Sequence, residues 1–381
     1  MRVIIAGGGT GGHIVPALAV ARTLLERGHD VSFLGTEAGL ESKMVPAAGF
    51  RFQPIRAQPF IRKASVATLR APVVAVTAIR ECRPHVRAAD VVLGMGGYVS
   101  VPVVLAARRE HVRAVLHEQN AVPGLANRAL ARLAGVVAVS FREAARVFPR
   151  RVRTVVTGNP VREQILRVPE ERDALAKEGR RDLDLDEGRR TVVVFGGSQG
   201  ALHVDRAAVG ACRLLADRAD VQIVLITGPA HLDVIRRAIP GGAAEGSIRV
   251  GGGNGILVRL IGFLDRMELA YACADLVVAR AGATTVAELT VCSLPALLIP
   301  YPFATAEHQE ANGLALQRAG GAIVMLDGQL SAASLADRIA SLIDDQDRLQ
   351  AMSEHSGRFG RPDAAERLAD VVLSTGQGGG R

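Results

Sequence analysis

The chain has 381 residues, 49% of them hydrophobic, which predicts a globular protein of two domains. It has no apolar run of roughly 18 residues that predicts a membrane span, its cysteines stand singly, and its N-terminus is no export signal, so we expect a cytoplasmic protein without a zinc site or a disulfide framework. The net charge of +8 predicts an anionic partner, and because only 3% of the residues are aromatic, we expect a membrane surface and no nucleic acid.

Short apolar runs of strand character alternate with helical stretches along the chain. They are VIIAG, VSFLG, VVLGM, RAVLHE, VVAVS and RTVVTG in a first series, and TVVVFGG, VQIVLITG, LVVAR, ALLIP and AIVML in a second. Such alternation is typical of βαβ units, whose parallel strands are buried on both faces. The sequence therefore predicts an α/β fold of two Rossmann-like, doubly wound domains facing an interdomain cleft, where such folds bind ligands.

A polar, charge-dense segment from Val168 to Arg190 separates the two series. GNPVR precedes it as the predicted hinge, so we place a first domain at 1–162 and a second at 163–357. Residues 358–381 contain the helical stretch PDAAERLADVVL, which we expect to pack back on the first domain, and a tail that we expect to be disordered. The acidic run DLDLD lies in the charged segment and is interpreted as a solvated loop rather than a metal site.

The first strand runs directly into the glycine turn AGGGTGGH, which ends at His13. Glycines at such a turn let backbone N–H groups approach a ligand, and the helix start favours an anion or a polar sugar. The turn also fits the dinucleotide pattern GxGxxG, but poorly, because Glu37 lies beyond the strand end where an acid would hold a ribose. His13 either only caps the helix or acts as a general base, since the helix dipole favours the neutral imidazole that accepts a proton.

Two further glycine turns occur in the second series. FGGSQGA follows one strand, and in ARAGATTVAEL another strand ends at a helix start that carries Glu288. The amides of that helix start suit a diphosphate, and a carboxylate a few residues on is placed to accept both hydroxyls of a ribose. The alternative is a capping box, in which Thr285 and Glu288 satisfy each other's backbone.

Seven motifs follow one another along essentially the whole chain. They are GGTGGH at 8–13, GMGGYVS at 94–100, HEQNAVPGLAN at 117–127, GNPVR at 158–162, GGSQGA at 196–201, AGATTVAE at 281–288 and HQEAN at 308–312. In this order they resemble the MurG-type glycosyltransferases of bacterial peptidoglycan synthesis. The resemblance implies a GT-B fold and the transfer of N-acetylglucosamine from its uridine diphosphate to undecaprenyl-linked muramyl pentapeptide, at the cytoplasmic face of the cell membrane.

The resemblance also implies the residues of the site. Contacts near the donor sugar are Thr10, Gly11, Gly12 and Asn120, with Gln309 on the sugar hydroxyls. Arg162 and Ser198 approach the diphosphate or the ribose, Ala283 and Thr284 cradle the phosphates, Glu288 holds the ribose, and Leu264 meets uracil through its backbone. Further substrate contacts are Gln199, Thr285, Val286 and Ala287. The acceptor side is lined by His13, Tyr98, Glu118 and Asn127.

The chain departs from the family pattern in two places. Ala281 stands where many relatives carry a serine, and the stretch EGSIRVGGGNGILVRL is long and glycine-rich, which leaves the loop before Leu264 and its uracil contact open. Neither departure touches the predicted chemistry. This is an inverting attack by the muramyl C4 hydroxyl, with His13 as the base and Glu118 as its rival. Helix amides and Arg162 stabilise the leaving diphosphate, without a metal or a cofactor.

The positive charge is concentrated in the first half, where residues 1–162 hold 23 Lys or Arg against 9 Asp or Glu. Within it, residues 56–87 combine an apolar centre with flanking arginines and are predicted to dock on an anionic leaflet. The alternative is a core-facing helix whose arginines extend to solvent. For the whole chain, the alternatives are a transferase for another membrane lipid, an NAD-dependent Rossmann enzyme and a non-catalytic adaptor.

Overall fold

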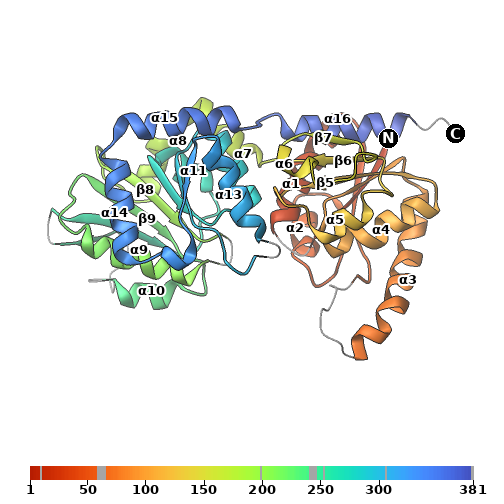
Figure 1. Cartoon of the computed structure of the whole chain (residues 1–381), viewed down its shortest axis with the longest axis horizontal. Coiled ribbons are helices and arrows are strands. Elements are labelled where there is room, and N and C mark those ends of the chain that lie inside the picture. The colour runs from red at the N-terminus through yellow and green to blue at the C-terminus, as the bar shows by residue number, and fades with distance from the viewer. Residues whose placement is uncertain are drawn as a thin grey trace. The chain divides into compact units, whose positions relative to one another are not determined.

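The computed structural model of the chain describes residues 1–8, 11–57, 66–197, 200–239, 247–251, 254–304 and 307–378, with backbone alone for 66–75. These residues divide into two compact units, whose elements are labelled in Figure 1. Unit 1 comprises Met1–Arg162 and Arg361–Arg381, and unit 2 comprises Glu163–Gly360.

The described part of unit 1 forms a seven-stranded parallel sheet in the order β3-β2-β1-β4-β5-β6-β7. Its strands are β1 (Arg2–Ala6), β2 (Asp30–Gly35), β3 (Arg51–Pro54), β4 (Val91–Gly94), β5 (Arg113–Glu118), β6 (Val136–Val139) and β7 (Thr154–Val156). Its helices are α1 (Gly11–Glu26), α2 (Glu41–Ala47), α3 (Val66–Arg87), α4 (Gly97–Arg109), α5 (Leu125–Leu130), α6 (Arg142–Ala145) and α16 (Ala364–Gln377).

Helices cover both faces of this sheet because successive side chains of a strand point to opposite sides. Val3 and Ile5 of β1 belong to a core shared with α1 and α16, whereas Ile4 and Ala6 belong to a core shared with α3 and α4. Both cores are apolar, so β1 reads as a continuous apolar run, as is typical of a buried parallel strand.

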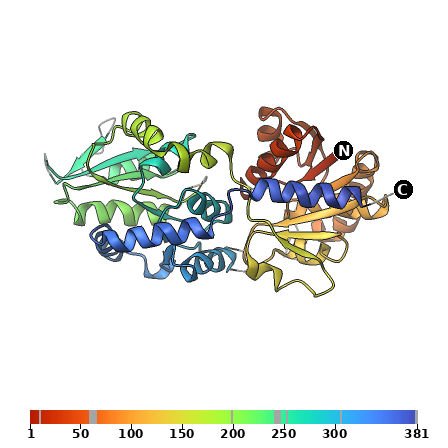
Figure 2. The same ribbon diagram turned by 90° about the horizontal axis from the view of Figure 1, so that it is seen from above.

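The end of the chain completes unit 1. Leu368, Ala369 and Val372 of α16 are buried in the same core as α1, and Figure 2 shows this helix lying along unit 1. At the surface, Arg27 donates to Asp370 at 2.5 Å. The last helix therefore supplies part of the hydrophobic core of the unit that begins the chain.

Unit 2 repeats the architecture, with its described strands in the order β10-β11-β9-β8-β12-β13-β14. The strands are β8 (Arg190–Phe195), β9 (Val221–Ile226), β10 (Ser247–Val250), β11 (Ile256–Ile261), β12 (Leu276–Ala279), β13 (Ala296–Leu298) and β14 (Ala322–Val324). The helices are α7 (Glu163–Leu166), α8 (Val168–Asp182), α9 (Leu202–Leu214), α10 (Leu232–Ala238), α11 (Met267–Cys273), α12 (Ala283–Val291), α13 (His308–Arg318), α14 (Ala332–Ile343), α15 (Gln346–Phe359) and a 3-10 helix (Asp327–Gln329).

Two stretches of unit 2 differ from the sequence prediction. The glycine-rich stretch before Leu264 contains β10 and β11, which pair antiparallel, and β11 continues as a parallel neighbour of β9. Gly255 lies so close to this pair that a Cβ there would be 1.9 Å from the carbonyl oxygen of Val250. Gly255 therefore permits a tight connection between two strands, where the sequence indicated only a loop.

The charge-dense segment 168–190 is likewise more than a connection between the two series, because its residues 168–182 form helix α8. Gly179 lets α8 approach α11 closely, since a Cβ at that position would lie 2.8 Å from the carbonyl oxygen of Leu269. In the following run DLDLD the aspartates are exposed or half-buried, whereas Leu183 and Leu185 are buried. The segment is a packed element of unit 2 with a charged outer face.

Candidate active site

Each sheet has one point where the strand order reverses, and ligands of doubly wound folds bind beyond the carboxyl ends of the strands at that point. In unit 1 it lies between β1 and β4, which continue into the turns GGTGGH and GMGG. In unit 2 it lies between β8 and β12, which continue into GGSQGA and ARAGAT. In each unit the topology thus brings two glycine-containing motifs of the sequence to one point: a predicted glycine turn and GMGG in unit 1, and two predicted glycine turns in unit 2.

His13 lies in the first turn of α1, where its half-buried ring packs against the turn that starts α4. A Cβ on Gly96 would lie 3.5 Å from the ring, and one on Gly97 would lie 3.6 Å from it. These two glycines have φ values of 86° and 71°, which other residues rarely adopt. Ser100 fixes the turn by donating to the carbonyl oxygens of Ala6 at 3.0 Å and Gly96 at 2.7 Å.

Glu118 ends β5 and is buried, with 2% of its surface exposed. Among the described residues its carboxylate accepts four hydrogen bonds, from the backbone N–H and the side-chain amide of Asn120, the N–H of Gly124 and the side-chain amide of Asn127. These donors occupy the carboxylate and order the loop that leads into α5. Glu118 is therefore placed to anchor the loop before α5 more than to receive a proton.

The remaining predicted residues of unit 1 lie around this pair of turns or at its edge. Tyr98 is the second residue of α4 and is half-buried. Asn127 is buried, and its side-chain oxygen has no hydrogen-bond partner among the described residues, which leaves a buried acceptor for a ligand. Gly11 and Gly12 begin α1, and a Cβ on Gly11 would meet no atom within 4 Å. The half-buried Arg162 is the last residue of unit 1 before unit 2 begins.

His117 is a fully buried residue of the site that the sequence analysis did not single out for a role. Its Nε2 lies 3.0 Å from the carbonyl oxygen of Gly158, and its Nδ1 lies 3.1 Å from the side-chain nitrogen of Gln119, which donates to the carbonyl oxygen of Met95 at 2.8 Å. The imidazole thus donates through Nε2 and accepts through Nδ1. Together with Gln119, it therefore connects Gly158, at the start of GNPVR, to Met95, just before the turn against which His13 packs.

Burial, with a smaller contribution from the nearby His13, lowers the pKa of His117 to about 4, although the hydrogen bond to Gly158 opposes part of this shift. An unfolded chain protonates the same group near its ordinary value of 6.5. Because the unfolded state then binds more protons, we expect unit 1 to lose up to about 3 kcal/mol of stability as the pH falls from neutral to about 4. Urea unfolding at pH 7, 5 and 4 measures this loss, and H117N should show less of it; an equal pH slope in the variant would contradict the assignment.

In unit 2, α12 begins directly after ARAG, with Gly282 at its N-cap and no side chain among the described residues capping its first turn. The capping box between Thr285 and Glu288 is therefore absent. The hydroxyl of Thr284 is buried and has no hydrogen-bond partner in the described part of the chain. Open amides and an unsatisfied hydroxyl at the positive end of a helix form a suitable cradle for phosphate oxygens.

Glu288 lies in the second turn of α12 and is 6% exposed. Its Oε2 accepts a hydrogen bond of 2.9 Å from the hydroxyl of the buried Tyr271 in α11, which orients the carboxylate. Val286 on the same helix is buried in the core, so only its backbone is available to a ligand, whereas Thr285 and Ala287 are half-buried. The partner Tyr271 carries no motif in the sequence and was not predicted.

Gln309 and Leu264 lie beyond the carboxyl ends of other strands of the same sheet. Gln309 is the second residue of α13, and its Oε1 accepts a hydrogen bond of 3.0 Å from the backbone N–H of Tyr301, after β13. The half-buried Leu264 follows β11, two strands away from the switch point. The predicted residues Thr10, Ser198 and Gln199 lie outside the described residues.

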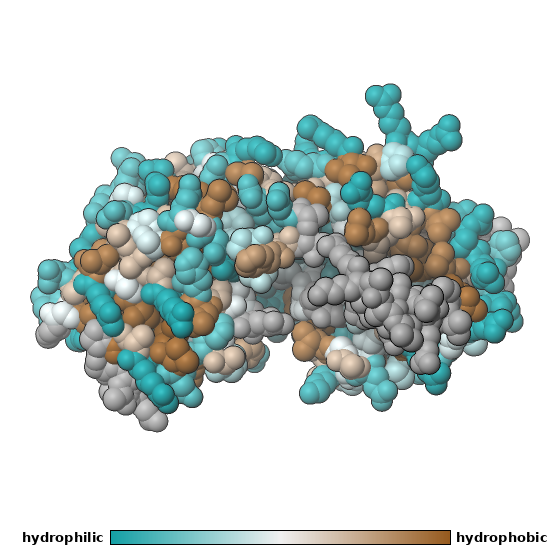
Figure 3. Space-filling view, turned by 60° about the horizontal axis from the view of Figure 1, so that its bottom comes forward, coloured by the Kyte–Doolittle hydropathy of each residue, from teal (hydrophilic) through white to brown (hydrophobic). Residues whose placement is uncertain are grey.

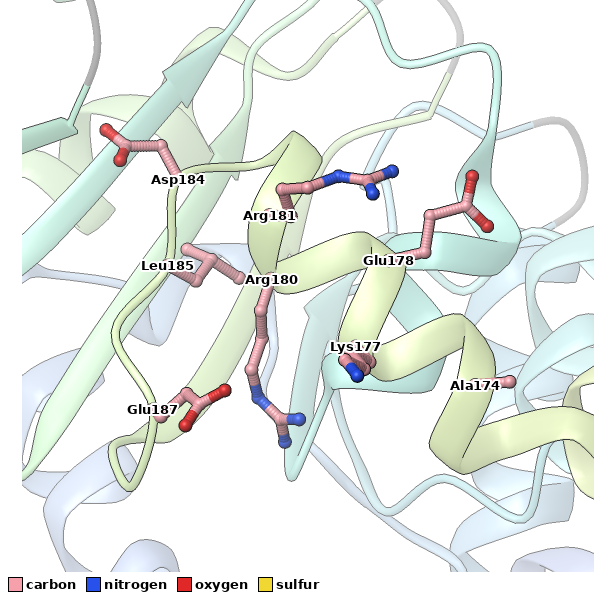
Figure 4. Close-up of a pocket in the computed structure, with 8 residues that line it drawn as sticks. All are labelled: Ala174, Lys177, Glu178, Arg180, Arg181, Asp184, Leu185 and Glu187. Atoms are coloured by element: carbon pink, nitrogen blue, oxygen red, sulfur yellow. The ribbon is translucent and has the colours of Figure 1, made fainter.

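Two other kinds of site were sought in the described part of the chain. No group of three or more His, Cys, Asp or Glu side chains there is arranged to hold a metal ion. A pocket lined by charged side chains, among them Arg180 and Glu187, lies along α8 and the turn before β8 (Figure 4). Because it lies near the amino end of β8, it is separate from the edge that carries the glycine turns.

Both units match one protein family. Residues 3–139 match the glycosyltransferase family 28 N-terminal domain, and residues 191–368 match its C-terminal domain. A protein of Halothermothrix orenii, named UDP-N-acetylglucosamine--N-acetylmuramyl-(pentapeptide) pyrophosphoryl-undecaprenol N-acetylglucosamine transferase, is 40% identical and covers 99% of this chain and 100% of its own. A protein of the same name from Moorella thermoacetica is also 40% identical, with full coverage of both chains.

A solved structure agrees with these matches. The crystal structure of Acinetobacter baumannii MurG is similar to this chain with a TM-score of 0.76 and 28% identity, over 98% of this chain and 99% of that one. The α/β class with two doubly wound domains, which the alternating strands and helices predicted, is confirmed. The chain therefore belongs to glycosyltransferase family 28 and, within it, to the MurG-type glycosyltransferases.

Proposed function

We propose that this chain transfers N-acetylglucosamine from UDP-N-acetylglucosamine to the C4 hydroxyl of undecaprenyl-diphosphate-linked muramyl pentapeptide, which converts lipid I into lipid II. The main support is the 40% identity to transferases of that name over the full length of the chain. The placement of the seven motifs on the carboxyl edges of the two sheets, where doubly wound folds bind ligands, agrees with it.

We propose that unit 2 binds the donor. The first-turn amides of α12, with the hydroxyl of Thr284, receive the diphosphate, and Glu288 receives the ribose hydroxyls. Gln309 contacts the sugar, and Leu264 contacts uracil. Each helix-dipole contribution is about 0.3–1 kcal/mol at exposed sites and about 2 kcal/mol in partly buried ones, so several donors act together as negative charge grows on the leaving group.

We propose that unit 1 binds the acceptor, with His13 as the general base. In the transfer, the C4 hydroxyl oxygen forms a bond to the anomeric carbon from the face opposite the diphosphate. The bond from that carbon to the β-phosphate oxygen breaks, UDP leaves with the electron pair, and the hydroxyl proton moves to the imidazole. Glu118 is the rival base, but its four hydrogen bonds support a structural role for it.

The decisive experiment measures UDP release with lipid-linked muramyl pentapeptide as acceptor. We expect release only when donor and acceptor are both present, and a disaccharide product with a β-1,4 link. Turnover should persist in a chelator of divalent cations, since amides and cationic side chains carry the charge of the diphosphate. Release of UDP with a different membrane lipid, but not with the muramyl acceptor, would overturn the proposed substrate.

We also propose that the segment 56–87 of unit 1 contacts an anionic membrane surface that carries the acceptor. No helix in the described ranges is both long and apolar enough to cross a bilayer. In the second half of α3, Ala78, Cys82 and Val86 are buried, and Cys82 and Val86 belong to the same core as α4, so this half has a core-facing stripe. Val76 and Arg80 are exposed on the same helix, and Figure 3 shows exposed apolar residues among hydrophilic ones on unit 1.

Several arginines of this segment also make ion pairs within the protein. Arg56 pairs with Glu81, and Arg83 and Arg87 share the carboxylate of Glu110, so each carboxylate is at least matched by positive charge. Arg56 and Arg87 nevertheless keep exposed side chains, and two arginines share the single charge of Glu110, so positive charge remains available to attract a surface. The membrane contacts predicted for residues 58–65 lie outside the described residues. The same holds for those predicted for the side chains of residues 66–75.

Co-sedimentation with vesicles tests the membrane contact. We expect binding to vesicles that contain phosphatidylglycerol and little binding to pure phosphatidylcholine, with a marked decrease at high salt. R80Q should weaken binding about fivefold, since one cation near the surface contributes about 1 kcal/mol. The matched control R338Q removes an exposed charge from unit 2 and should leave binding unchanged; equal losses in both variants would contradict the assignment to α3.

A further inference from the structure

Arg280 is a buried cation at the carboxyl end of β12, one residue before the turn that starts α12. Only 7% of its surface is exposed. Its Nη1 lies 3.2 Å from the carbonyl oxygen of Ile299, 3.0 Å from that of Pro300 and 2.6 Å from Oδ1 of Asp327. One guanidinium group therefore connects the end of β12, the end of β13 and the 3-10 helix that follows β14.

The partners of Arg280 extend the network to the other turns of the same edge. Oδ2 of Asp327 lies 2.9 Å from Nδ1 of His203, at the start of α9 after the GGSQGA turn. Burial alone would raise the pKa of Asp327, but hydrogen bonds from Arg280 and His203 hold it below its ordinary value, so the carboxylate stays charged. On the other side, the guanidinium lies over the ring of Tyr301, 5.6 Å from its centroid.

The same network reaches the residue that is proposed to contact the donor sugar. The backbone N–H of Tyr301 donates to Oε1 of Gln309 at 3.0 Å. A second link runs from α13 to the α12 turn, because the buried Asn312 donates to the carbonyl oxygen of Ala281 at 3.1 Å. The start of α12 and the start of α13 are thus held to each other through Arg280, Tyr301 and Asn312.

We propose that Arg280 is a positioning residue that couples recognition of the donor diphosphate at α12 to recognition of the donor sugar by Gln309. This inference rests on the proposed function, which supplies the donor. Arg280 itself contacts protein groups. It acts by keeping the Tyr301 N–H, and with it the amide of Gln309, in register with the amides of the α12 turn.

The flat guanidinium over Tyr301 favours an arginine for this coupling, whereas all three hydrogen bonds use Nη1. A guanidinium group is planar and offers several N–H donors in fixed directions, so Arg280 can serve acceptors at the end of β13 and in the 3-10 helix at the same time. A lysine ammonium keeps the charge opposite Asp327 but not the fork of donors or the flat face over Tyr301. R280K therefore separates the geometric role of the side chain from its charge.

A double-mutant cycle with Gln309 provides the test. The dissociation constants of UDP and of UDP-N-acetylglucosamine are measured by calorimetry for the full-length wild type, R280K, Q309A and the double variant. The dissociation constant of UDP divided by that of UDP-N-acetylglucosamine, here called the sugar ratio, reports how much the sugar contributes to binding. We expect R280K to raise the donor KM about tenfold to hundredfold, with the acceptor KM unchanged, as for the loss of hydrogen bonds to a charged group.

The cycle distinguishes coupling from general damage. If Arg280 positions Gln309, R280K lowers the sugar ratio toward that of Q309A, and adding Q309A to R280K lowers it no further. Independent, multiplicative effects of the two substitutions would overturn the inference, as would an unchanged ratio in a folded R280K. D327N, which keeps the shape of the carboxylate and removes its charge, serves if R280K fails to fold, and it should lower the same ratio.

Two controls complete the design. Arg218 pairs with Asp220 and Asp344 near the amino end of β9, so R218K disturbs a comparable arginine network away from the donor edge and should leave the sugar ratio unchanged. Wild-type protein that binds neither UDP nor its sugar derivative would refute the proposed function itself. Wild-type binding with an unaffected R280K would refute only the coupling.

Discussion

H13A should lower kcat by about a hundredfold to ten-thousandfold, the usual contribution of general acid–base catalysis, while the donor KM changes little. The imidazole lies in the first turn of α1 against Gly96 and Gly97, so its removal opens space beside the turn that starts α4 and removes the proposed base. Steady-state UDP release at saturating acceptor measures kcat, and calorimetry with UDP measures donor binding separately.

A second histidine near the other end of the same helix provides the control for H13A. His29 lies three residues after α1 ends, where its ring contacts the N-terminal amine of Met1 at 3.2 Å, so H29A should keep normal turnover. An unchanged kcat in folded H13A would remove His13 as the base. If E118Q then lost turnover at unchanged stability, the base would be Glu118 instead.

The second large effect is expected on donor binding. E288A should weaken the affinity for UDP and raise the donor KM about tenfold to hundredfold, because a hydrogen bond to a charged group contributes about 1.5–3 kcal/mol. The variant should keep most of its kcat at saturating donor, since the carboxylate is proposed to hold the ribose rather than the reacting atoms. Initial rates over a range of donor concentrations separate the two parameters.

A modified donor makes this test specific to the ribose. Wild-type enzyme should discriminate against a donor whose ribose lacks the 2′-hydroxyl, and E288A should lose that discrimination. Y271F removes only the hydroxyl that donates to Oε2 of Glu288, so it should cause a smaller rise in donor KM. If E288A retained full discrimination between the two donors, Glu288 would not be the ribose contact.

Most of the fold was predictable because its signals are local. The apolar strands and the glycine turns follow from hydrophobic patterning and from backbone geometry, which neighbouring residues largely control. The predicted pattern missed β3, β10 and β11. Gly251 and Gly255 lie in the tight connection between β10 and β11, and in a sequence such glycines look the same as those of any loop. The predicted pattern also interpreted α8 as a separator, since a helix with one narrow buried stripe has a charge-rich sequence.

The candidate site was predictable only where a motif carries it. His13, Glu118 and Glu288 stand in recognisable patterns, and the structure places each on a carboxyl edge of its own sheet. Tyr271 has no such pattern, because it reaches Glu288 from a helix seventeen residues earlier in the chain. The capping box predicted as an alternative for Thr285 is absent, which leaves the α12 amides available.

The local sequence thus determines the two series of strands and helices, the glycine turns, the order of the motifs and the family to which the chain belongs. The distant partners of Arg280 and His117 emerge only on folding, because they are between 19 and 47 residues away in the chain and the strand order brings them together. A buried charge or imidazole is stable only when such distant donors and acceptors satisfy it, and long-range pairing of this kind leaves no periodic trace in a sequence.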